Sequence, residues 1–138
     1  PKSSILNSRM ICVLGSAGGG RDKWKRPEMG RVAASYCDAI VLTNEDPYDE
    51  DPIKIIREIE AGVHENPHFD AKLSALTWRI LERREAIMHA LSLAREGDAV
   101  VLTGKGSESW IHEARGRRIP WNEKQIVEDT LRDLKTKE

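Results

Sequence analysis

Short apolar runs alternate with segments of helical periodicity along this chain. The runs lie at 10–14 (MICVL), 39–43 (AIVLT), 75–81 and 99–103 (AVVLT). Uninterrupted apolar runs such as AIVLT and AVVLT are typical of strands covered on both faces of a parallel sheet. The alternation of strands and helices therefore predicts an α/β domain with helices on both faces of a parallel sheet.

Four helices are expected from the spacing of apolar residues, over about 27–36, 52–63, 83–95 and from 123 onward. Asp51 and Asn122 are expected N-caps, and Pro27 stands at a first helical position, where proline is favoured. The side chains expected to face the core are Met29, Val32, Ala33 and Tyr36, then Ile53, Ile56, Ile59 and Val63, and in the last helix Val127, Leu131 and Leu134. Residues 64–74 are expected to form a loop, and residues 109–120 a hairpin about Gly116.

Composition limits the classes of partner. The 138 residues carry a net charge of −1, so no overall field attracts nucleic acid or acidic membranes. Trp24 among lysines and arginines would suit single-stranded nucleic acid, but the acidic segment 44–51 argues against it. No apolar run is long enough to span a bilayer. Cys12 and Cys37 are expected to be buried, reduced thiols of a cytoplasmic protein.

Polar loops follow three of the predicted strands: Gly15–Arg26 is basic, Asn44–Asp51 is acidic, and Gly104–Glu108 carries both signs. Loops at the carboxyl ends of parallel strands are where ligands bind in open α/β sheets. Such a rim suits a zwitterion, with Arg21 on a carboxylate and Glu108 or Asp46 on an amine. The alternative is that these are three solvated surface loops.

Two familiar motifs are present only in part. The segment GSAGGGRD has the glycine spacing of a phosphate-binding loop, but Arg21 and Asp22 replace its lysine and its serine or threonine. HENPH matches H-E-x-x-H, but Pro67 is incompatible with the helix that would bring both histidines to one face. We therefore expect neither an autonomous nucleotide site nor a metal site.

Four segments together resemble one family. GGGRDKWKRPEMG resembles GGdRDxgKRPxMg, TNEDPYDEDPIKII resembles T-x-DNPR-x-E-x-P-x-x-I, ERREAI resembles DRxxAI, and GDAVVLTGKGSE resembles gDvVLiaGKGHE. These are signatures of the Mur ligases, and the resemblance is greatest to the branch that adds the third amino acid of the peptidoglycan stem. It covers nearly all of residues 1–138 and implies the family's C-terminal domain alone. That domain is a Rossmann-like three-layer α/β unit with a mostly parallel sheet of about six strands.

The resemblance implies an activity for the full-length protein. In this family ATP phosphorylates the carboxylate of a UDP-N-acetylmuramoyl-peptide, and the amine of the incoming amino acid attacks the acyl phosphate with the help of Mg²⁺. ATP and Mg²⁺ are bound mainly by a central domain, which this chain lacks. The present domain is expected to hold the amino acid, to close onto its own central domain in the cytoplasm, and to be inactive alone. Neither nucleic acid nor membrane is an expected partner.

The resemblance also implies site residues. Arg21 is expected to bind the α-carboxylate of the incoming amino acid, and Asp46 and Tyr48 to contact its side chain. Gly104 and Glu108 are expected to line the same pocket, with Glu108 on a distal amine. Lys25 and Arg26 are expected to reach toward the nucleotide when the domains close. We expect no catalytic residue and no metal ligand within this domain.

Two departures from the family pattern bear on the substrate. Tyr48 stands where family members specific for meso-diaminopimelate use an arginine on the distal carboxylate, and Ser107 replaces the histidine of GKGHE. Because the neighbouring side chains are acidic, we expect lysine or ornithine rather than meso-diaminopimelate. Another diamino acid, a ligase outside the main pathway, and Lys105 as a replacement for the missing cation are the alternatives. The alternative hypothesis for the whole chain is a non-catalytic binding or regulatory module that kept this fold.

Overall fold

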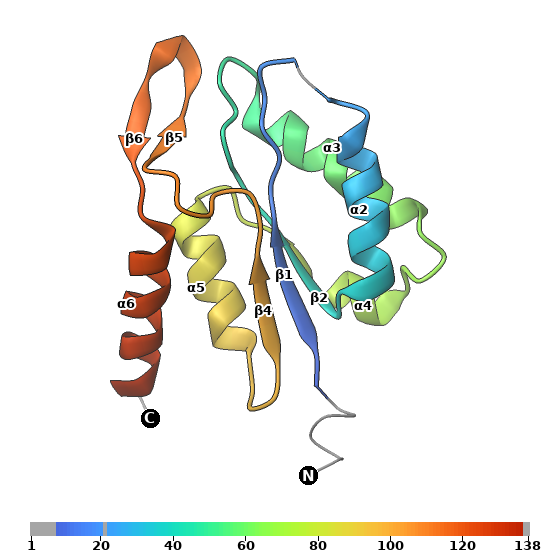
Figure 1. The fold of residues 1–138 in the computed structure, drawn as a ribbon. Coiled ribbons are helices and arrows are strands. Elements are labelled where there is room, and N and C mark those ends of the chain that lie inside the picture. The colour runs from blue at the N-terminus through green and yellow to red at the C-terminus, as the bar shows by residue number, and fades with distance from the viewer. Residues whose placement is uncertain (1–7, 21, 137–138) are drawn as a thin grey trace.

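The computed structural model describes residues 8–20 and 22–136, whose centre is a four-stranded parallel sheet (Figure 1). Its strands are β1 (Met10–Leu14), β2 (Ala39–Leu42), β3 (Thr77–Arg79) and β4 (Ala99–Leu102), in the order β3-β2-β1-β4. β1 is central, and Cys12 pairs with Ile40 on one side and with Val101 on the other. All four strands end at the same edge because they are parallel, so the loops that follow them meet there.

Helices cover both faces of the sheet. On one face lie α2 (Lys25–Tyr36) and α3 (Pro52–Glu65), and on the other lies α5 (Arg83–Leu93), against which α6 (Glu123–Thr136) packs (Figure 1). The predicted caps are present: Asp51 accepts a hydrogen bond from the Ile53 N–H at 2.9 Å, and Asn122 accepts one from Gln125 at 3.0 Å. Among the described residues, no helix is long and apolar enough to cross a membrane.

The sheet separates two hydrophobic cores. The larger core packs α2 and α3 onto one face through side chains that include Leu14, Leu42 and Ile59. The second packs α5 onto the other face, with Val13 and Val41 against Ala86 and Ala90. Alternate residues of β1 and β2 enter opposite cores, which is why those runs contain no polar residue. The α/β class, the parallel sheet and the two helical layers are confirmed.

The six strands do not form one sheet. β5 (Trp110–His112) and β6 (Arg118–Pro120) make a separate antiparallel pair, with a 3₁₀ turn (Ala114–Gly116) between them. This hairpin is bound to the loop after β2: the Tyr48 N–H donates to the His112 carbonyl at 3.2 Å, and the His112 N–H donates to Asp46 Oδ1 at 2.8 Å. The hairpin therefore leaves the edge of β4 and packs over the loops.

The expected loop at 64–74 is only partly a loop. α3 continues to Glu65, and a short helix, α4 (Ala71–Ala75), follows Asp70, whose side chain accepts a hydrogen bond from the Leu73 N–H at 2.8 Å. β3 is shorter than the expected strand at 75–81 for the same reason. His64 lies in α3 and His68 beyond its end, so the H-E-x-x-H letters do not share one helix.

Three predicted helix faces differ from the observed ones. In α3, Ile53 is 36% exposed, and Ile55 is buried instead. In α2, Val32 and Tyr36 are 51% and 73% exposed, while Ala33 and Ala34 are buried with Gly30. The small residues allow α2 to lie directly on α3, so packing between the helices, rather than apolar periodicity, decides which face is buried. In α6, Leu131 is 50% exposed. The buried positions of that helix include Ile126 and Thr130.

The cysteines are also not as expected. Cys12 in β1 and Cys37 at the end of α2 form a disulfide, with their Cα atoms 6.1 Å apart. A central strand and the helix that covers it bring the two residues together across 25 positions of sequence. The expectation of reduced thiols is wrong for this structure, because a sequence does not give the distance between a strand and the helix packed on it.

The close packing of α2 on α3 gives a test of the fold. A Cβ atom added at Gly62 would lie 1.8 Å from the Pro27 carbonyl oxygen, which is backbone and cannot turn aside. We expect Gly62→Ala to lower the free energy of unfolding by about 1–3 kcal/mol in urea titrations. Helix propensity alone would raise it by about 1 kcal/mol, so a more stable variant would contradict the packing. The control is Ala61→Gly at the exposed neighbouring position, which should cost only about 1 kcal/mol.

Candidate functional site

Three loops meet at the carboxyl edge of the sheet, after β1, β2 and β4. The first two are joined by hydrogen bonds from the glycine backbone: the Gly18 N–H donates to the Asp46 carbonyl at 2.6 Å, and the Gly20 N–H donates to the Glu50 side chain, at Oε1, at 2.6 Å. Only glycine fits at position 18, because a Cβ atom there would lie 1.9 Å from the Pro47 carbonyl oxygen. The glycine turn after β1 therefore lies directly against the acidic loop after β2.

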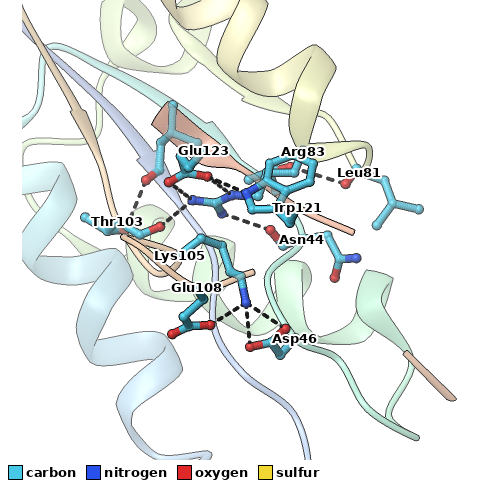
Figure 2. Close-up of polar contacts among 11 residues, drawn as sticks. Asn44, Asp46, Leu81, Arg83, Thr103, Lys105, Glu108, Trp121 and Glu123 are labelled. Carbon is cyan, nitrogen blue, oxygen red and sulfur yellow. Dashed lines mark hydrogen bonds and ion pairs between the residues drawn. The ribbon is translucent and has the colours of Figure 1, made fainter. Parts of the chain in front are cut away.

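A buried ammonium joins the loop after β2 to the loop after β4. Lys105 is completely buried, and its Nζ lies 3.0 and 2.9 Å from the two carboxylate oxygens of Asp46 and 2.5 Å from Glu108 Oε2 (Figure 2). Burial alone would lower the pKa of Lys105, but its hydrogen bonds to Glu108 and Asp46 raise it above the ordinary value. Lys105 is therefore a fixed positive charge beneath the rim of the site.

Asp46 and Tyr48 are held by the hairpin. Asp46 is 7% exposed, and its carboxylate is bound by Lys105 and by the His112 N–H. The ring of Tyr48 stacks on the imidazole of His112, with centroids 5.3 Å apart and planes 8° from parallel. Of these two predicted contacts, Tyr48 is at the surface, whereas Asp46 lies beneath it and supports Lys105.

Glu45 is a candidate that the sequence motifs did not single out. Its carboxyl lies against Gly104, where a Cβ atom would be 2.6 Å from Glu45 Oε2, and a Cβ atom at Gly15 would be 3.2 Å from that of Glu45. No hydrogen bond to this carboxyl is present within 8–20 and 22–136. Burial raises the pKa of Glu45 to about 7, and the charges of Asp46 and Glu108 act in the same direction against the lowering effect of Arg83. The sequence signal was an acidic residue in the loop after a strand, with glycines in both facing loops.

A second buried cation supports the site from below. Arg83, at the start of α5, binds the carboxylate of Glu123 at 2.7 and 3.0 Å and donates to the backbone carbonyls of Asn44 and Thr103 at 3.0 and 2.7 Å (Figure 2). Trp121 donates its indole N–H to the same glutamate at 3.1 Å. One guanidinium thus fixes the ends of β2 and β4 relative to α5 and α6.

The two residues expected to approach a nucleotide differ in their surroundings. Arg26 is completely buried, where it binds Glu50 at 3.1 Å and Glu58 at 2.9 Å and donates to the Ala17 carbonyl at 3.0 Å. Those bonds occupy its terminal nitrogens, so in this structure Arg26 holds the glycine turn. Its approach to a nucleotide on domain closure stays a prediction. Lys25 is half-exposed and pairs with Asp22 at 3.1 Å. Contact between Lys25 and a nucleotide stays a prediction.

The predicted site residues are thus divided. Gly104, Glu108 and Tyr48 lie at or near the surface of the rim, and Arg21 lies outside the described residues. Glu108 binds Lys105 with one oxygen, and its side chain is 55% exposed. A groove of about 1000 Å³ lies on the hairpin side of Tyr48, between Pro47, Ile111 and Trp121, and Lys105, Asp46 and Glu108 do not line it. The charged cluster and this groove are therefore separate features.

Comparison with known proteins agrees with the motifs. A family model described as Mur ligase, glutamate ligase domain, matches residues 3–106. The chain belongs to the Mur ligase family. A relative from Aquifex aeolicus, named UDP-N-acetylmuramoyl-L-alanyl-D-glutamate--2,6-diaminopimelate ligase, is 40% identical over 127 residues, which are 92% of this chain and 24% of that protein. The protein of the same name from Caldanaerobacter subterraneus is 42% identical over 124 residues, 89% of this chain and 24% of its own length.

A solved Mur ligase structure shares the fold. The structure of a UDP-N-acetylmuramoyl-L-alanyl-D-glutamate--2,6-diaminopimelate ligase matches with a TM-score of 0.76 and 30% identity, over 91% of this chain and 24% of the other. The present chain therefore spans about a quarter of the length of the relatives it matches. The family resemblance inferred from the sequence is confirmed.

The raised pKa of Glu45 predicts a pH dependence of stability. Between its ordinary value of 4.5 and about 7, the native state retains a proton that the unfolded state has released. The free energy of unfolding should therefore fall as pH rises through this window, and protonated Glu45 should be the more stable form. The test compares the urea midpoint of unfolding of the wild type with that of Glu45→Gln at several pH values. The difference, wild type minus variant, should decrease from pH 4.5 to 7.5. A flat difference, matching that of the exposed control Glu96→Gln, would contradict the assignment.

Proposed function

We propose that this domain holds the incoming amino acid of an ATP-dependent Mur-type ligase in peptidoglycan synthesis. The full-length enzyme adds that amino acid to a UDP-N-acetylmuramoyl-peptide through an acyl phosphate. The observation that carries the proposal is the cluster of Asp46, Lys105 and Glu108 at the carboxyl edge of the sheet. It supplies fixed negative charge where the family's motifs converge, and the relatives are named as ligases of this kind.

The residues have distinct proposed roles. Arg21 binds the α-carboxylate, an assignment that rests on the family motif. Glu108 and Glu45 receive amines, because the first is exposed and the second has no hydrogen-bonding partner within the described residues. Gly104 lets the backbone approach the ligand closely. Asp46 acts through Lys105 rather than on the ligand, since its carboxylate is already bound on the inner side.

The central domain is the proposed site of ATP and Mg²⁺. In the sequence, Arg21 and Asp22 stand at the positions of the phosphate-loop lysine and its serine or threonine, and in the structure Arg26 is bound to carboxylates. The proposed partners are therefore the amino acid, the UDP-N-acetylmuramoyl-peptide acceptor and the protein's own central domain, in the cytoplasm. The non-catalytic alternative has no observation in its favour.

The charges at the rim favour a substrate with a cationic side chain. Lys105 is buried and already binds the carboxylates of Asp46 and Glu108, so its ammonium has no donor left for a carboxylate of the substrate. Glu45 adds a third acidic side chain to this part of the rim. Tyr48 offers a neutral hydroxyl. A rim of this sign attracts an ammonium and repels a distal carboxylate. We therefore propose lysine or ornithine as the substrate.

meso-Diaminopimelate is the second candidate, and a specific observation favours it. The relatives at 40 and 42% identity are named as 2,6-diaminopimelate ligases. Identity over the domain reflects its scaffold, whereas the choice of substrate depends on the few side chains of the rim. Competition between the two amino acids for the full-length enzyme, with ATP and Mg²⁺, decides between them. A clear preference for diaminopimelate would reject the lysine proposal and leave the ligase proposal standing.

Arg21→Ala tests the amino-acid site itself. A guanidinium binds a carboxylate through two parallel hydrogen bonds, and losing them should cost about 1.5–3 kcal/mol. In steady-state kinetics of the full-length enzyme, we expect the KM for the amino acid to rise about 10- to 150-fold. The KM for ATP should change little. If only the KM for ATP changes, Arg21 acts on the nucleotide, and its assignment to the α-carboxylate of the amino acid is wrong.

Tyr48→Arg tests the basis of substrate choice. An arginine at this position adds a cation at the rim, so we expect the ratio of kcat/KM for diaminopimelate to that for lysine to increase. Tyr48→Phe is the matched control, since it keeps the ring on His112 without adding charge. Glu108→Gln should weaken lysine selectively. An unchanged ratio in Tyr48→Arg would show that residue 48 does not face the side chain of the substrate.

A further inference from the structure

We propose that Cys12 and Cys37 are a reversible redox-modification site whose oxidants are low-molecular-weight disulfides such as glutathione disulfide. Oxidation fixes the position of α2 on β1, and through it the order of the glycine turn. The expected effect on amino-acid binding rests on the proposed function. The redox chemistry and the order of the turn do not depend on it.

The two cysteines are held at bonding distance by rigid elements. Cys12 is the middle residue of the central strand β1, and Cys37 directly follows the last turn of α2. Their Cα separation of 6.1 Å lies inside the range that a disulfide spans without backbone movement. In the reduced protein, each thiol therefore has its partner at a high effective concentration, and ring closure competes well with reaction in solution.

The two sulfurs differ in access. Cys12 is 4% exposed, whereas Cys37 is half-buried and lines an apolar groove of about 540 Å³. Met29, Val32 and Tyr36 form one side of this groove. A small thiol or disulfide therefore reaches Cys37 first, and Cys12 is the resolving residue.

The exchange is balanced in two steps. The Cys37 thiolate attacks one sulfur of glutathione disulfide, forms a mixed disulfide and releases one glutathione thiolate. The Cys12 thiolate then attacks the Cys37 sulfur, forms the intramolecular disulfide and releases the second glutathione. Two protein thiols are oxidised and one glutathione disulfide is reduced to two glutathiones. Excess glutathione reverses both steps.

The fold does not require the disulfide, which is why both states are expected to be native. α2 is also held by Ala33 and Ala34 in the core, by the contact of Gly30 with α3, and by the ion pairs of Arg26 with Glu50 and Glu58. Disulfides in cytoplasmic proteins are usually transient or redox-sensing rather than permanent. The Cys12–Cys37 disulfide fits this redox-sensing class, because it joins elements that other contacts already hold in place.

The disulfide acts on the site because of what it encloses. The segment between Cys12 and Cys37 contains the glycine turn and the first turn of α2, where Arg26 binds the Ala17 carbonyl and Glu50. Glu50 in turn accepts the Gly20 N–H. A disulfide at the base of this segment restricts its locally unfolded states, and so disfavours opening of the turn. Reduction leaves the turn to its hydrogen bonds alone.

The test equilibrates the full-length protein in a series of glutathione redox buffers. After an acid quench and alkylation, tryptic peptides Met10–Arg21 and Val32–Lys54 report the two cysteines. We expect a disulfide-linked pair that appears in oxidising buffers and disappears in reducing ones. In Cys12→Ala the glutathione adduct should accumulate on Cys37, whereas Cys37→Ala should leave Cys12 largely unmodified.

Two further measurements test whether oxidation of the cysteine pair affects the glycine turn and amino-acid binding. Hydrogen exchange of backbone amides in 15–20 should be faster in the reduced protein, and the KM for the amino acid severalfold higher. In Cys37→Ala, which forms neither the disulfide nor the adduct on residue 37, both values should match the reduced wild type in every buffer. Absence of the linked peptides at the most oxidising buffer would overturn the proposal, as would equal exchange or an equal KM in the two states. If the enzyme shows no amino-acid-dependent turnover, the proposed function fails, and peptide mapping with hydrogen exchange decides the redox proposal.

Discussion

The arrangement of the rim depends on the burial of Lys105. A primary ammonium removed from water is stable only when carboxylates surround it, so the loops after β2 and β4 must deliver Asp46 and Glu108 to the same point. The buried guanidinium of Arg83 likewise needs partners, which are the carboxylate of Glu123 and the backbone carbonyls of Asn44 and Thr103, just after β2 and β4. The rim is thus shaped by two fully buried cations, Lys105 and Arg83.

This arrangement decides which carboxylates remain for a ligand. Asp46 is bound on its inner side by Lys105 and by the His112 N–H, so its charge is neutralised before any substrate arrives. Glu108 shares only one oxygen with Lys105. Glu45, directly before Asp46 in sequence, lies against Gly104 instead and keeps its proton to about pH 7, its pKa in the folded chain. A neutral amine that takes up this proton would become an ammonium paired with the Glu45 carboxylate, which is the contact proposed above for Glu45.

The sequence predicted the features that depend on local signals. The strands, the N-caps Asp51 and Asn122, and the hairpin about Gly116 follow from apolar runs and turn chemistry, and the structure contains them. Features that depend on distant parts of the chain were missed. The buried face of α2 depends on how closely Gly30 approaches α3, and the pairing of Cys12 with Cys37 depends on how that helix lies over β1. No periodicity within a single segment contains those distances.

In the candidate site, too, local sequence signals predicted the position of the loops but not the orientation of individual side chains. The sequence predicted that the three loops meet at the carboxyl edge of the sheet, and they do, because parallel strands bring the loops that follow them together. The sequence did not say which of the adjacent residues Glu45 and Asp46 faces outward, since a loop has no repeating geometry. That choice is made by Lys105, whose own burial follows from the packing of the hairpin through His112. Tyr48, to which we assign substrate choice, is exposed and takes no part in the ion pairs of Lys105, so a substitution there is expected to leave the buried charges and the fold of the rim unchanged.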